Sequence, residues 1–285
     1  MSDIENISDT ALWVAAYRAL ESRRPDALFK DPYAEKLAGE RGFEIARGFD
    51  IKGQSFGGTW AIAVRTVVID ELVLKAVSQG VDTVVDLAAG LDCRPFRLSL
   101  PADLHWIDVD LPGILRYKGE KLAQAKPRCR YRPVELDLAD QEKRRAFFAE
   151  VAAGSSRTLI LAEGIMMYLT EEQAVSLAQD LSRHPSFKYW IQDYLSPMLL
   201  KILSRRWGER LRRARAPFQF APKEGPAFFE RTGWKVLENR PILSEAERLG
   251  REPSLNWLWK LARPFSLPSL RRKVLKMNGI ALLGR

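Results

Sequence analysis

The stretch that most constrains the fold is residues 84–98, VVDLAAGLDCRPFRL. It opens within an apolar run, TVVDLA, whose length suits a β-strand buried on both faces. One acid, Asp86, lies in the middle of this run. The run ends in a turn of small residues, Ala88-Ala89-Gly90, where the backbone can come close to a ligand. These residues predict an α/β sheet with a binding turn after its first strand.

A second apolar run, LHWIDVDL, ends in an acid, Asp110, about twenty residues after the turn. In a Rossmann-like sheet, the turn after strand one passes under a bound adenosine, and an acid ending strand two accepts hydrogen bonds from the ribose hydroxyls. The turn has no G-x-G-x-x-G motif, because only Gly90 is glycine. Without that pyrophosphate cradle, the pattern argues against NAD and favours a nucleoside ligand without phosphates, such as S-adenosylmethionine. The alternative is a plain sheet in which Gly90 only turns the chain.

Strands and helices alternate through the middle of the chain. The expected strands are 83–89, 104–110, 130–138, 157–163 and 188–195, and helices are expected at 112–125, 141–153 and 171–183. Alternation at this interval predicts βαβ units and a parallel sheet. After Pro197 the alternation stops: a basic helical segment (198–226) precedes a strand (234–240), a segment rich in Pro and Trp, and a last apolar stretch, GIALLGR.

Residues 1–80 are expected to form helices. Thr10 is expected to cap the run ALWVAAYRALES, and Asp31 to cap DPYAEKLAGE, with Pro32 at the first helical position. A third helix, WAIAVRTVVIDELVLKAVSQG, is expected to end at Gly80, and the glycine-rich GQSFGGTW (53–60) reads as a connector.

Composition and cysteine usage bound the class of protein. The 285 residues, 46% of them hydrophobic, suffice for one α/β domain with a lid or for two small domains. The acidic N-terminus does not resemble a signal peptide, and no apolar run approaches the roughly twenty residues that span a bilayer. Cys93 and Cys129 are expected to be reduced thiols, and with His105 and His184 they offer no metal-ligand spacing. A cytoplasmic protein without a metal or a membrane partner is expected.

The positive charge is concentrated in the last third of the chain. Residues 201–285 hold 20 Lys and Arg against 7 Asp and Glu, whereas residues 1–200 hold 25 against 29. Such a basic surface can attract nucleic acid, an acidic protein or an anionic substrate. The alternative is a solvated face that keeps the protein soluble.

Several segments together resemble the leucine carboxyl methyltransferase family of S-adenosylmethionine-dependent enzymes. They are SDTALWVAAYRALESRRPDALFKDPYAEKLAG, VVDLAAGLDCRPFRL, IDVDLPGILRYK, VELDL, LILAEGIMMYL and FFERTGWKVLE. Their order and spacing match over nearly the whole chain, closest to a bacterial branch that includes tetracenomycin-type polyketide O-methyltransferases. The family usually reads L-G-A-G-L-D-T-R in the first motif, where this chain has Ala88 and Cys93. We expect Ala88 to be tolerated if its φ is an ordinary negative one.

The resemblance implies a class I methyltransferase fold: a Rossmann-like seven-stranded sheet, mostly parallel, whose last strand lies antiparallel beside strand five. It also implies a division of the chain. Residues 1–80 would form an N-terminal helical cap. Residues 81–285 would form the S-adenosylmethionine-binding catalytic domain, with insertions roofing the substrate at about 198–226 and 243–275.

The resemblance also implies roles at the adenosine end of the cofactor. Asp110 would accept both ribose hydroxyls, with Asp108, on the same face of the strand, as the alternative. Asp137 and Leu138 would meet the adenine, the acid at the exocyclic amine and the backbone N–H at a ring nitrogen. The alternative for Asp137 is a helix cap for the residues that follow.

At the methionine end, the resemblance implies that Gly90 lies under the cofactor and that Glu163 holds its ammonium group. An acid ending an apolar strand, LILAE, is hard to explain by core packing. Arg65 would bind the methionine carboxylate. Its alternative is an ion pair with Asp70 or Glu71 of the same helix.

The expected acceptor residues are Tyr168, which matches an active-site tyrosine of the family, and Tyr17 and Arg18 on the first helix. An arginine is a good clamp for a carboxylate, but both residues of that helix could simply pack the lid. Arg94 and Arg97 are expected to hold the cofactor loop through ion pairs rather than to bind substrate. Trp207, Trp257 and Trp259 would wall the roof, with core filling as the alternative.

The function expected from this reading is O-methylation of a small, polyketide-like natural product, free or presented on an acidic carrier protein. A carboxylate acceptor is already ionised and needs no general base, whereas a phenol or alcohol needs one, so the shortage of histidines favours a methyl ester. An RNA-modifying or RNA-binding protein is one alternative, although the chain lacks a recognised RNA-binding module. A carboxyl methyltransferase for a protein C-terminus is another.

Overall fold

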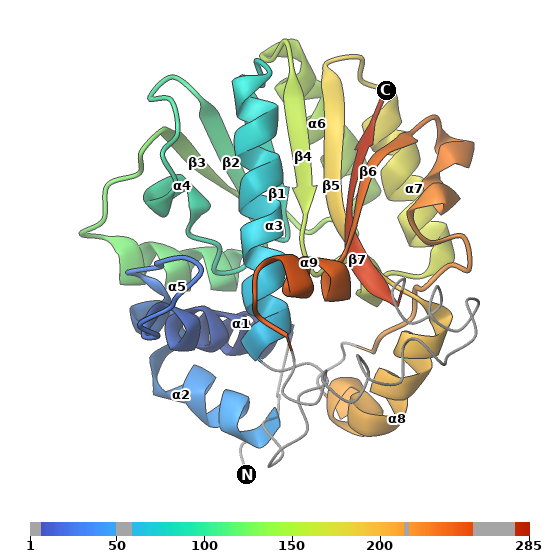
Figure 1. The fold of residues 1–285 in the computed structure, drawn as a ribbon. Helices are drawn as coiled ribbons and strands as arrows, with labels where there is room; N and C mark the ends of the chain where they lie inside the picture. Colours follow the sequence, from blue (N-terminus) through green and yellow to red (C-terminus); the bar gives the residue numbers. More distant parts are fainter. Residues whose placement is uncertain (1–6, 50–58, 214–216, 253–276) are drawn as a thin grey trace.

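Seven strands form one mixed sheet in the computed structural model of this chain, which describes residues 7–49, 59–213, 217–252 and 277–285 (Figure 1). They are β1 (Thr83–Leu87), β2 (His105–Asp110), β3 (Arg130–Glu135), β4 (Thr158–Ala162), β5 (Phe187–Leu195), β6 (Lys235–Pro241) and β7 (Asn278–Gly284). Their order in the sheet is β3-β2-β1-β4-β5-β7-β6. β7 pairs antiparallel with β5 and β6, and the remaining pairs are parallel, which confirms the predicted fold class.

The described helices surround this sheet. They are α1 (Ile7–Ser22), α2 (Ala34–Phe49), α3 (Thr59–Ser78), α4 (Arg94–Arg97), α5 (Pro112–Leu122), α6 (Gln141–Ala153), α7 (Glu171–Ser182), α8 (Pro197–Arg213) and α9 (Ile242–Arg248), with 3-10 turns η1 (Met166–Tyr168) and η2 (Gly225–Thr232). Most predicted elements lie within a few residues of these bounds. Much of the expected connector falls outside the described residues.

The start of α1 differs from the prediction. Thr10 lies inside α1, because the helix begins at Ile7, so the expected cap at Thr10 is wrong. Asp31 does cap the start of the next helical segment. Its Oδ1 accepts hydrogen bonds from the backbone N of Tyr33 and of Ala34, each at 3.1 Å. At the end of α3, Gly80 has a φ of 88°, the left-handed conformation expected of a glycine that ends a helix.

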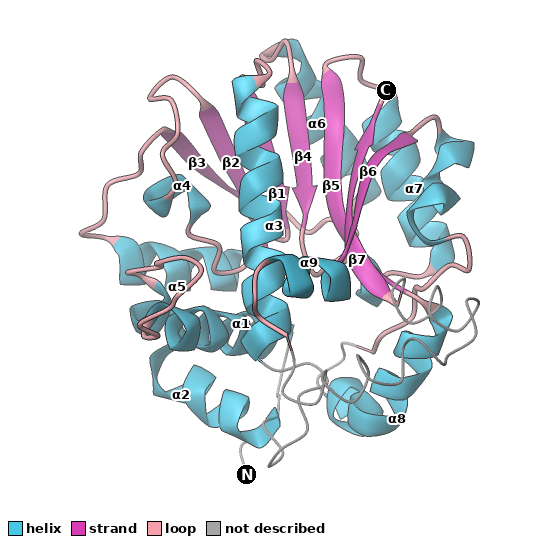
Figure 2. Ribbon diagram, viewed as in Figure 1, coloured by secondary structure: helices cyan, strands magenta, loops and turns pink. Residues whose placement is uncertain are grey.

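Helices cover both faces of the sheet (Figure 2). Val84 of β1 packs in one core cluster with α3 and α9, and its neighbour Val85 packs in the opposite cluster with α6 and α7. All residues of β1 and β4 are buried, because helices lie over both sides of the sheet centre. β3 is an edge strand, which explains how it accommodates Pro133, a residue without an N–H to donate.

The remaining helices gather at the carboxyl ends of the parallel strands. Figure 1 shows α1, α2 and α8 beyond this end of the sheet, whereas α3 runs along the sheet face. α1, α2 and α5 share a core cluster that includes Tyr17, Leu37 and Ile114. Within residues 1–80, α1 and α2 therefore cover the strand ends, while α3 also belongs to the packing of the sheet. Trp257 and Trp259 lie outside the described residues, as does the part of the second expected insertion after residue 252.

Candidate functional site

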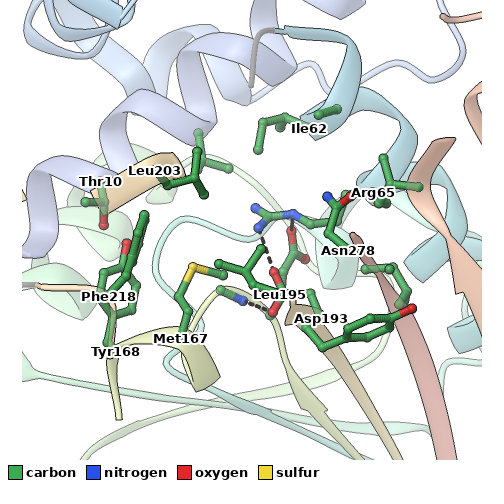
Figure 3. A pocket seen from close by; sticks show the side chains of 18 of the residues that line it. Thr10, Ile62, Arg65, Met167, Tyr168, Asp193, Leu195, Leu203, Phe218 and Asn278 are labelled. Carbon is green, nitrogen blue, oxygen red and sulfur yellow. Dashed lines mark hydrogen bonds and ion pairs between the residues drawn. The ribbon is translucent and has the colours of Figure 1, made fainter. Parts of the chain in front are cut away.

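A cavity of about 850 Å³ lies at the carboxyl ends of the strands, where α1, α3 and α8 meet the sheet (Figure 3). Its two ends differ in chemistry. The polar end consists of Arg65, Asp86, the turn 88–92, Glu163, Gly164 and Asp193. The apolar end, called here the α8 chamber, consists of Met167, Leu195, Met198, Leu199, Ile202 and Leu203.

The turn after β1 has an unusual backbone. Gly90 has a φ of 51°, and Ala88 has a φ of 56°, the only positive φ of a non-glycine residue in the described chain. The condition under which Ala88 was expected to be tolerated is therefore not met. An alanine in the left-handed region costs roughly 1–2 kcal/mol relative to its usual conformations, because its Cβ crowds the following carbonyl. The surrounding structure holds this residue in a strained conformation.

Helix α1 lies directly over this turn. A Cβ added to Gly90 would come within 3.3 Å of the Ala11 Cβ, a tight contact in addition to the unfavourable φ. Arg18 of α1 donates from Nη2 to the Leu91 carbonyl oxygen, and its Nε donates to Asp31 at 3.0 Å. Gly90 is thus required both by its conformation and by the approach of α1.

Asp110 touches the turn, and Asp108 does not. The side chain of Asp110 accepts hydrogen bonds from the Gly90 N at 2.6 Å and from the Leu111 N at 2.7 Å. These two bonds lower the pKa of Asp110, but burial outweighs them and raises it above its usual value. Asp108 is completely buried and accepts from Lys118, Trp106 and Tyr131. Neither acid is among the residues that line the cavity, but its contact with Gly90 makes Asp110 the candidate for a ligand at this edge.

Arg65 and Glu163 meet at the polar end together with Asp193. The Arg65 Nε lies 2.9 Å from the Glu163 Oε1, and its Nη1 donates to the Asp193 Oδ2 at 3.0 Å (Figure 3). Asp193 also accepts from the Gly164 N at 2.8 Å, and burial raises its pKa. Arg65 is therefore held in a structural ion pair, as its alternative supposed, but the partners are Glu163 and Asp193, because Asp70 and Glu71 pair with other arginines.

Arg94 connects the turn to this cluster. It pairs with Glu163 at 2.8 Å, with Asp70 at 2.7 Å and with Asp92, while Arg97 pairs with Asp70. Burial alone would raise the pKa of Glu163, but the guanidinium groups of Arg94 and Arg65 outweigh it and hold that pKa below its usual range. The predicted ion pairs of Arg94 and Arg97 are present, and those of Arg94 join Asp92 of the turn to Glu163 and to Asp70 of α3.

Asp86 is a second buried acid at the polar end. Its Oδ2 has no hydrogen-bond partner although it is shielded from solvent, and the residue lines the cavity. Burial raises the pKa of Asp86 well above its ordinary value, with the charges of Asp92 and Asp108 adding to the effect. An unsatisfied buried oxygen at a cavity wall marks a place where a ligand could donate.

Asp137 and Leu138 follow β3 and are not among the residues lining the cavity. Asp137 is exposed, and its Oδ1 accepts from the Ala139 N at 2.9 Å in a local turn. The cap of α6 is Asp140, whose side chain accepts from the Lys143 N, so the alternative role of Asp137 as that cap is wrong.

The three expected acceptor residues occupy different places. Tyr168 lines the cavity and hydrogen-bonds to Thr10, and burial raises its pKa to about 12. Arg18 reaches the wall but directs two donors at Asp31 and Leu91. Tyr17 is almost completely buried in the helical cluster and does not line the cavity. Trp207 lies on α8, in the first expected insertion.

Two cavity residues have no counterpart in the sequence reasoning. Asp193 was part of an expected strand, and its pairing with Arg65 joins residues 128 positions apart. Asn278 precedes the apolar stretch that predicted the last strand, and it lies opposite Leu195 in the β5–β7 pairing. Asn278, a polar residue at the start of β7, offered a signal at a strand end, whereas Asp193 lies inside β5 and its local sequence offered none.

The described residues offer neither a metal-binding cluster nor a membrane-spanning helix. No group of three or more His, Cys, Asp or Glu side chains in the described ranges could hold a metal ion. Within the same ranges, none of the helices is both long enough and apolar enough to cross a bilayer.

The sequence of this chain is similar to a known protein family and to individual members of it. A family model described as leucine carboxyl methyltransferase matches residues 11–182. A relative from Parafrankia sp. (strain EAN1pec), named "Putative S-adenosyl-L-methionine-dependent methyltransferase", is 38% identical over 184 residues, 62% of this chain and 59% of that protein. One of the same name from Saccharopolyspora erythraea is 32% identical over 276 residues, 87% of this chain and 93% of that protein. The chain thus matches less than two thirds of the first relative and nearly all of the second.

Solved structures show the same fold. A DUF574 family protein from Streptomyces avermitilis matches with a TM-score of 0.59 over 97% of both chains, at 13% identity. A structure titled as a putative methyltransferase from Thermobifida fusca also gives a TM-score of 0.59 at 13% identity, over 99% of this chain and 95% of that one. At such low identity these likenesses show the fold alone.

Proposed function

Because this chain belongs to the leucine carboxyl methyltransferase family, we propose that it transfers a methyl group from S-adenosylmethionine to a carboxylate of a small organic molecule. The product would be a methyl ester. The acceptor is taken to be a natural product, polyketide-like in the reading from sequence, either free or held on an acidic carrier protein.

The polar end fits the methionine part of S-adenosylmethionine. Asp86 offers a buried oxygen without a partner, and Glu163 offers a carboxylate held ionised by two arginines. The Glu163 carboxylate suits the ammonium group, because buried cations need negative partners, and the unpartnered Asp86 oxygen can accept one of the ammonium hydrogens. Arg65 would face the methionine carboxylate, and the turn at Gly90 would pass under the ligand.

The adenosine would extend from this turn toward β2 and β3. Asp110 already orients the Gly90 N–H, and its remaining lone pairs can accept from the ribose hydroxyls. Asp137 and Leu138 stand at the end of the next strand, where the adenine would reach. When bound, S-adenosylmethionine supplies an activated methyl carbon that an acceptor oxygen takes while the C–S electron pair goes to sulfur.

The protein's part in this reaction is to align the reactants and exclude water. α1 closes over the turn through Arg18, and α8 forms one wall of the apolar end. Tyr168 would offer its neutral hydroxyl to the acceptor oxygen and so fix its direction of approach.

The observation that carries the carboxylate acceptor is the state of the groups that could act as a base. Neither His nor Lys is among the described residues that line the cavity, and Tyr168 keeps its proton to about pH 12. Glu163 and Asp193 pair with Arg65, and Asp92 pairs with Arg94. Asp86, the remaining carboxyl among the described lining residues, is assigned in this proposal to the methionine end of the cofactor. A phenol or alcohol would need a base, whereas a carboxylate is ionised at neutral pH.

The test is methyl transfer from isotope-labelled S-adenosylmethionine to matched pairs of acceptors that differ only in carrying a carboxylic acid or a phenol. We expect label in the acid alone, in a product that mild base hydrolyses. Label in a base-stable product would replace the ester by an ether. Label only in RNA or in a protein C-terminus would replace the small-molecule acceptor.

A further inference from the structure

The α8 chamber has walls of flexible, apolar side chains. Three of the chain's five methionines, Met167, Met198 and Met277, line the cavity. Leu195, Leu199 and Met277 form a separate core cluster against which Met167 and Leu203 pack. Methionine adapts its shape to irregular or mobile apolar partners, so these walls suit a flexible chain better than one rigid outline.

Hydroxyl groups near the chamber are already engaged. The Tyr194 hydroxyl donates to the Asn239 Oδ1 at 2.9 Å, and Tyr168, which bonds to Thr10, is the hydroxyl that the proposed function assigns to the acceptor carboxylate. A ligand with many oxygens would leave several of them without partners after losing water, which costs about 1–3 kcal/mol for each buried group. An alkyl chain loses no hydrogen bonds on entering.

The mouth of the chamber lies on α8. Met198 and Ile202, one helical turn apart, both line the cavity and are 42% and 41% exposed. Lys201 and Arg205 are exposed on the same helix. The exposed apolar pair extends the wall of the chamber to the surface, so the end of a long alkyl chain can lie there, and the basic surface begins beside it.

We propose that the acceptor is an aliphatic carboxylic acid with a single alkyl chain that lies in the α8 chamber, with its carboxylate toward the polar end. The identity of the reacting group rests on the proposed function. The chain-binding role of the chamber rests on its walls and its mouth.

The first experiment measures binding of hexanoate, octanoate, decanoate and dodecanoate to the protein saturated with S-adenosylhomocysteine, by calorimetry below the micelle concentration. Burial of each methylene should tighten binding about fourfold until the chain reaches Met198 and Ile202, after which affinity should level off. A flat polyhydroxylated aromatic acid of similar size should bind more weakly than decanoate. Affinity independent of chain length, or tighter binding of the aromatic acid, would overturn the proposal.

The second experiment fills the chamber. Leu203→Trp should weaken dodecanoate binding by about tenfold or more while octanoate suffers less, because the added ring occupies the space of the chain end. Leu74→Trp is the matched control, since Leu74 is a partly exposed leucine of α3 outside the cavity. Both variants should bind S-adenosylhomocysteine within about twofold of the unmodified chain.

Should Leu203→Trp fail to fold, Ile202→Asn at the exposed mouth replaces it and should weaken only the longer acids. Equal chain-length series in the variants and the unmodified protein would contradict the proposal. Chain-length-dependent binding without methyl transfer would refute the proposed function and leave the chamber assignment standing. If esters form but the affinity of the acids does not depend on chain length, the proposed function stands and the assignment of the chamber is refuted.

Discussion

At the polar end of the cavity, Arg65 and Arg94 bridge Glu163, Asp193 and Asp70 at 2.7–3.0 Å, whereas the α8 chamber is walled by leucine, isoleucine and methionine. Ion pairs and hydrogen bonds are directional, so they fix one arrangement of the turn and of any ligand on it. Apolar contacts depend mainly on buried area and permit several arrangements.

Because of this difference, substitutions at the two ends of the cavity should affect different properties of the protein. Substitutions at the polar end should affect the stability of the fold and the affinity for the cofactor, because each charge there holds another in place. Substitutions in the chamber should affect the acceptor alone.

The largest effect is expected for Arg94→Met. Arg94 is nearly completely buried and serves three carboxylates, so its removal leaves Asp70, Asp92 and Glu163 short of a counter-charge. Breaking a buried ion pair by removing one partner costs about 3–5 kcal/mol. We expect a loss of this size in the free energy of unfolding, measured by urea denaturation.

Arg231→Met is the control for charge removal. Arg231 pairs with Glu171 at 3.0 Å, but both side chains are at least half exposed. An exposed pair contributes at most about 1 kcal/mol, so this variant should unfold almost as the unmodified chain does. Equal losses in the two variants would show that the polar end gains no special stability from its buried arginine.

The next effect concerns the cofactor. Asp110→Ala should weaken binding of S-adenosylhomocysteine by about 1.5–3 kcal/mol, the range for hydrogen bonds to a charged group, as measured by calorimetry. Glu135→Ala is the control, because Glu135 is the partner of Asp110 in the β2–β3 register and pairs only with Arg116 at the surface. Unchanged affinity in Asp110→Ala would remove Asp110 from the cofactor site.

Much of the polar end could be predicted from local sequence. The apolar run before Ala88, the acid that ends LHWIDVDL and the acid that ends LILAE each belong to a strand whose carboxyl end must reach one edge of a parallel sheet. That rule brings Gly90, Asp110 and Glu163 together without knowledge of any contact. The ion pairs of the loop could also be predicted from local sequence, because Arg94 lies within the motif VVDLAAGLDCRPFRL.

The rest depends on contacts between distant segments. Asp193 pairs with Arg65 across 128 positions, and nothing in the local pattern of β5 marks it. Tyr17 fits a helix face equally well toward the cavity or toward α2, and the packing of α1 on α2 decides the latter. The φ of Ala88 is likewise fixed by the turn as a whole, and residue type alone argued for a negative value.

The strained turn gives a smaller prediction. Ala88→Gly should raise the free energy of unfolding by about 0.5–1 kcal/mol, because relief of the left-handed alanine outweighs the greater freedom of glycine in the unfolded chain. Ala89→Gly is the matched control. Ala89 is not among the residues with positive φ, so the same change there should destabilise by a similar amount. Thermal denaturation of both variants measures whether each substitution raises or lowers the stability. Destabilisation by both Ala88→Gly and Ala89→Gly would show that Ala88 is not strained.

The smallest expected effect is on the pH dependence of catalysis. Burial raises the pKa of Tyr168 from its usual value near 10 to about 12, so the hydroxyl keeps its proton throughout the range from about pH 6.5 to pH 9.5. A carboxylate acceptor is ionised over the same range, so kcat/KM should be flat there. Tyr168→Phe should lower kcat/KM by about twofold, the low end of the range for one lost hydrogen bond, while leaving the profile flat. If Tyr168 instead acted as the base, the rate of the unmodified protein would rise about tenfold per pH unit and the variant would lose that slope. A rising profile would therefore reassign Tyr168 from orienting the acceptor to deprotonating it, and would reopen the choice of a phenol or alcohol as acceptor.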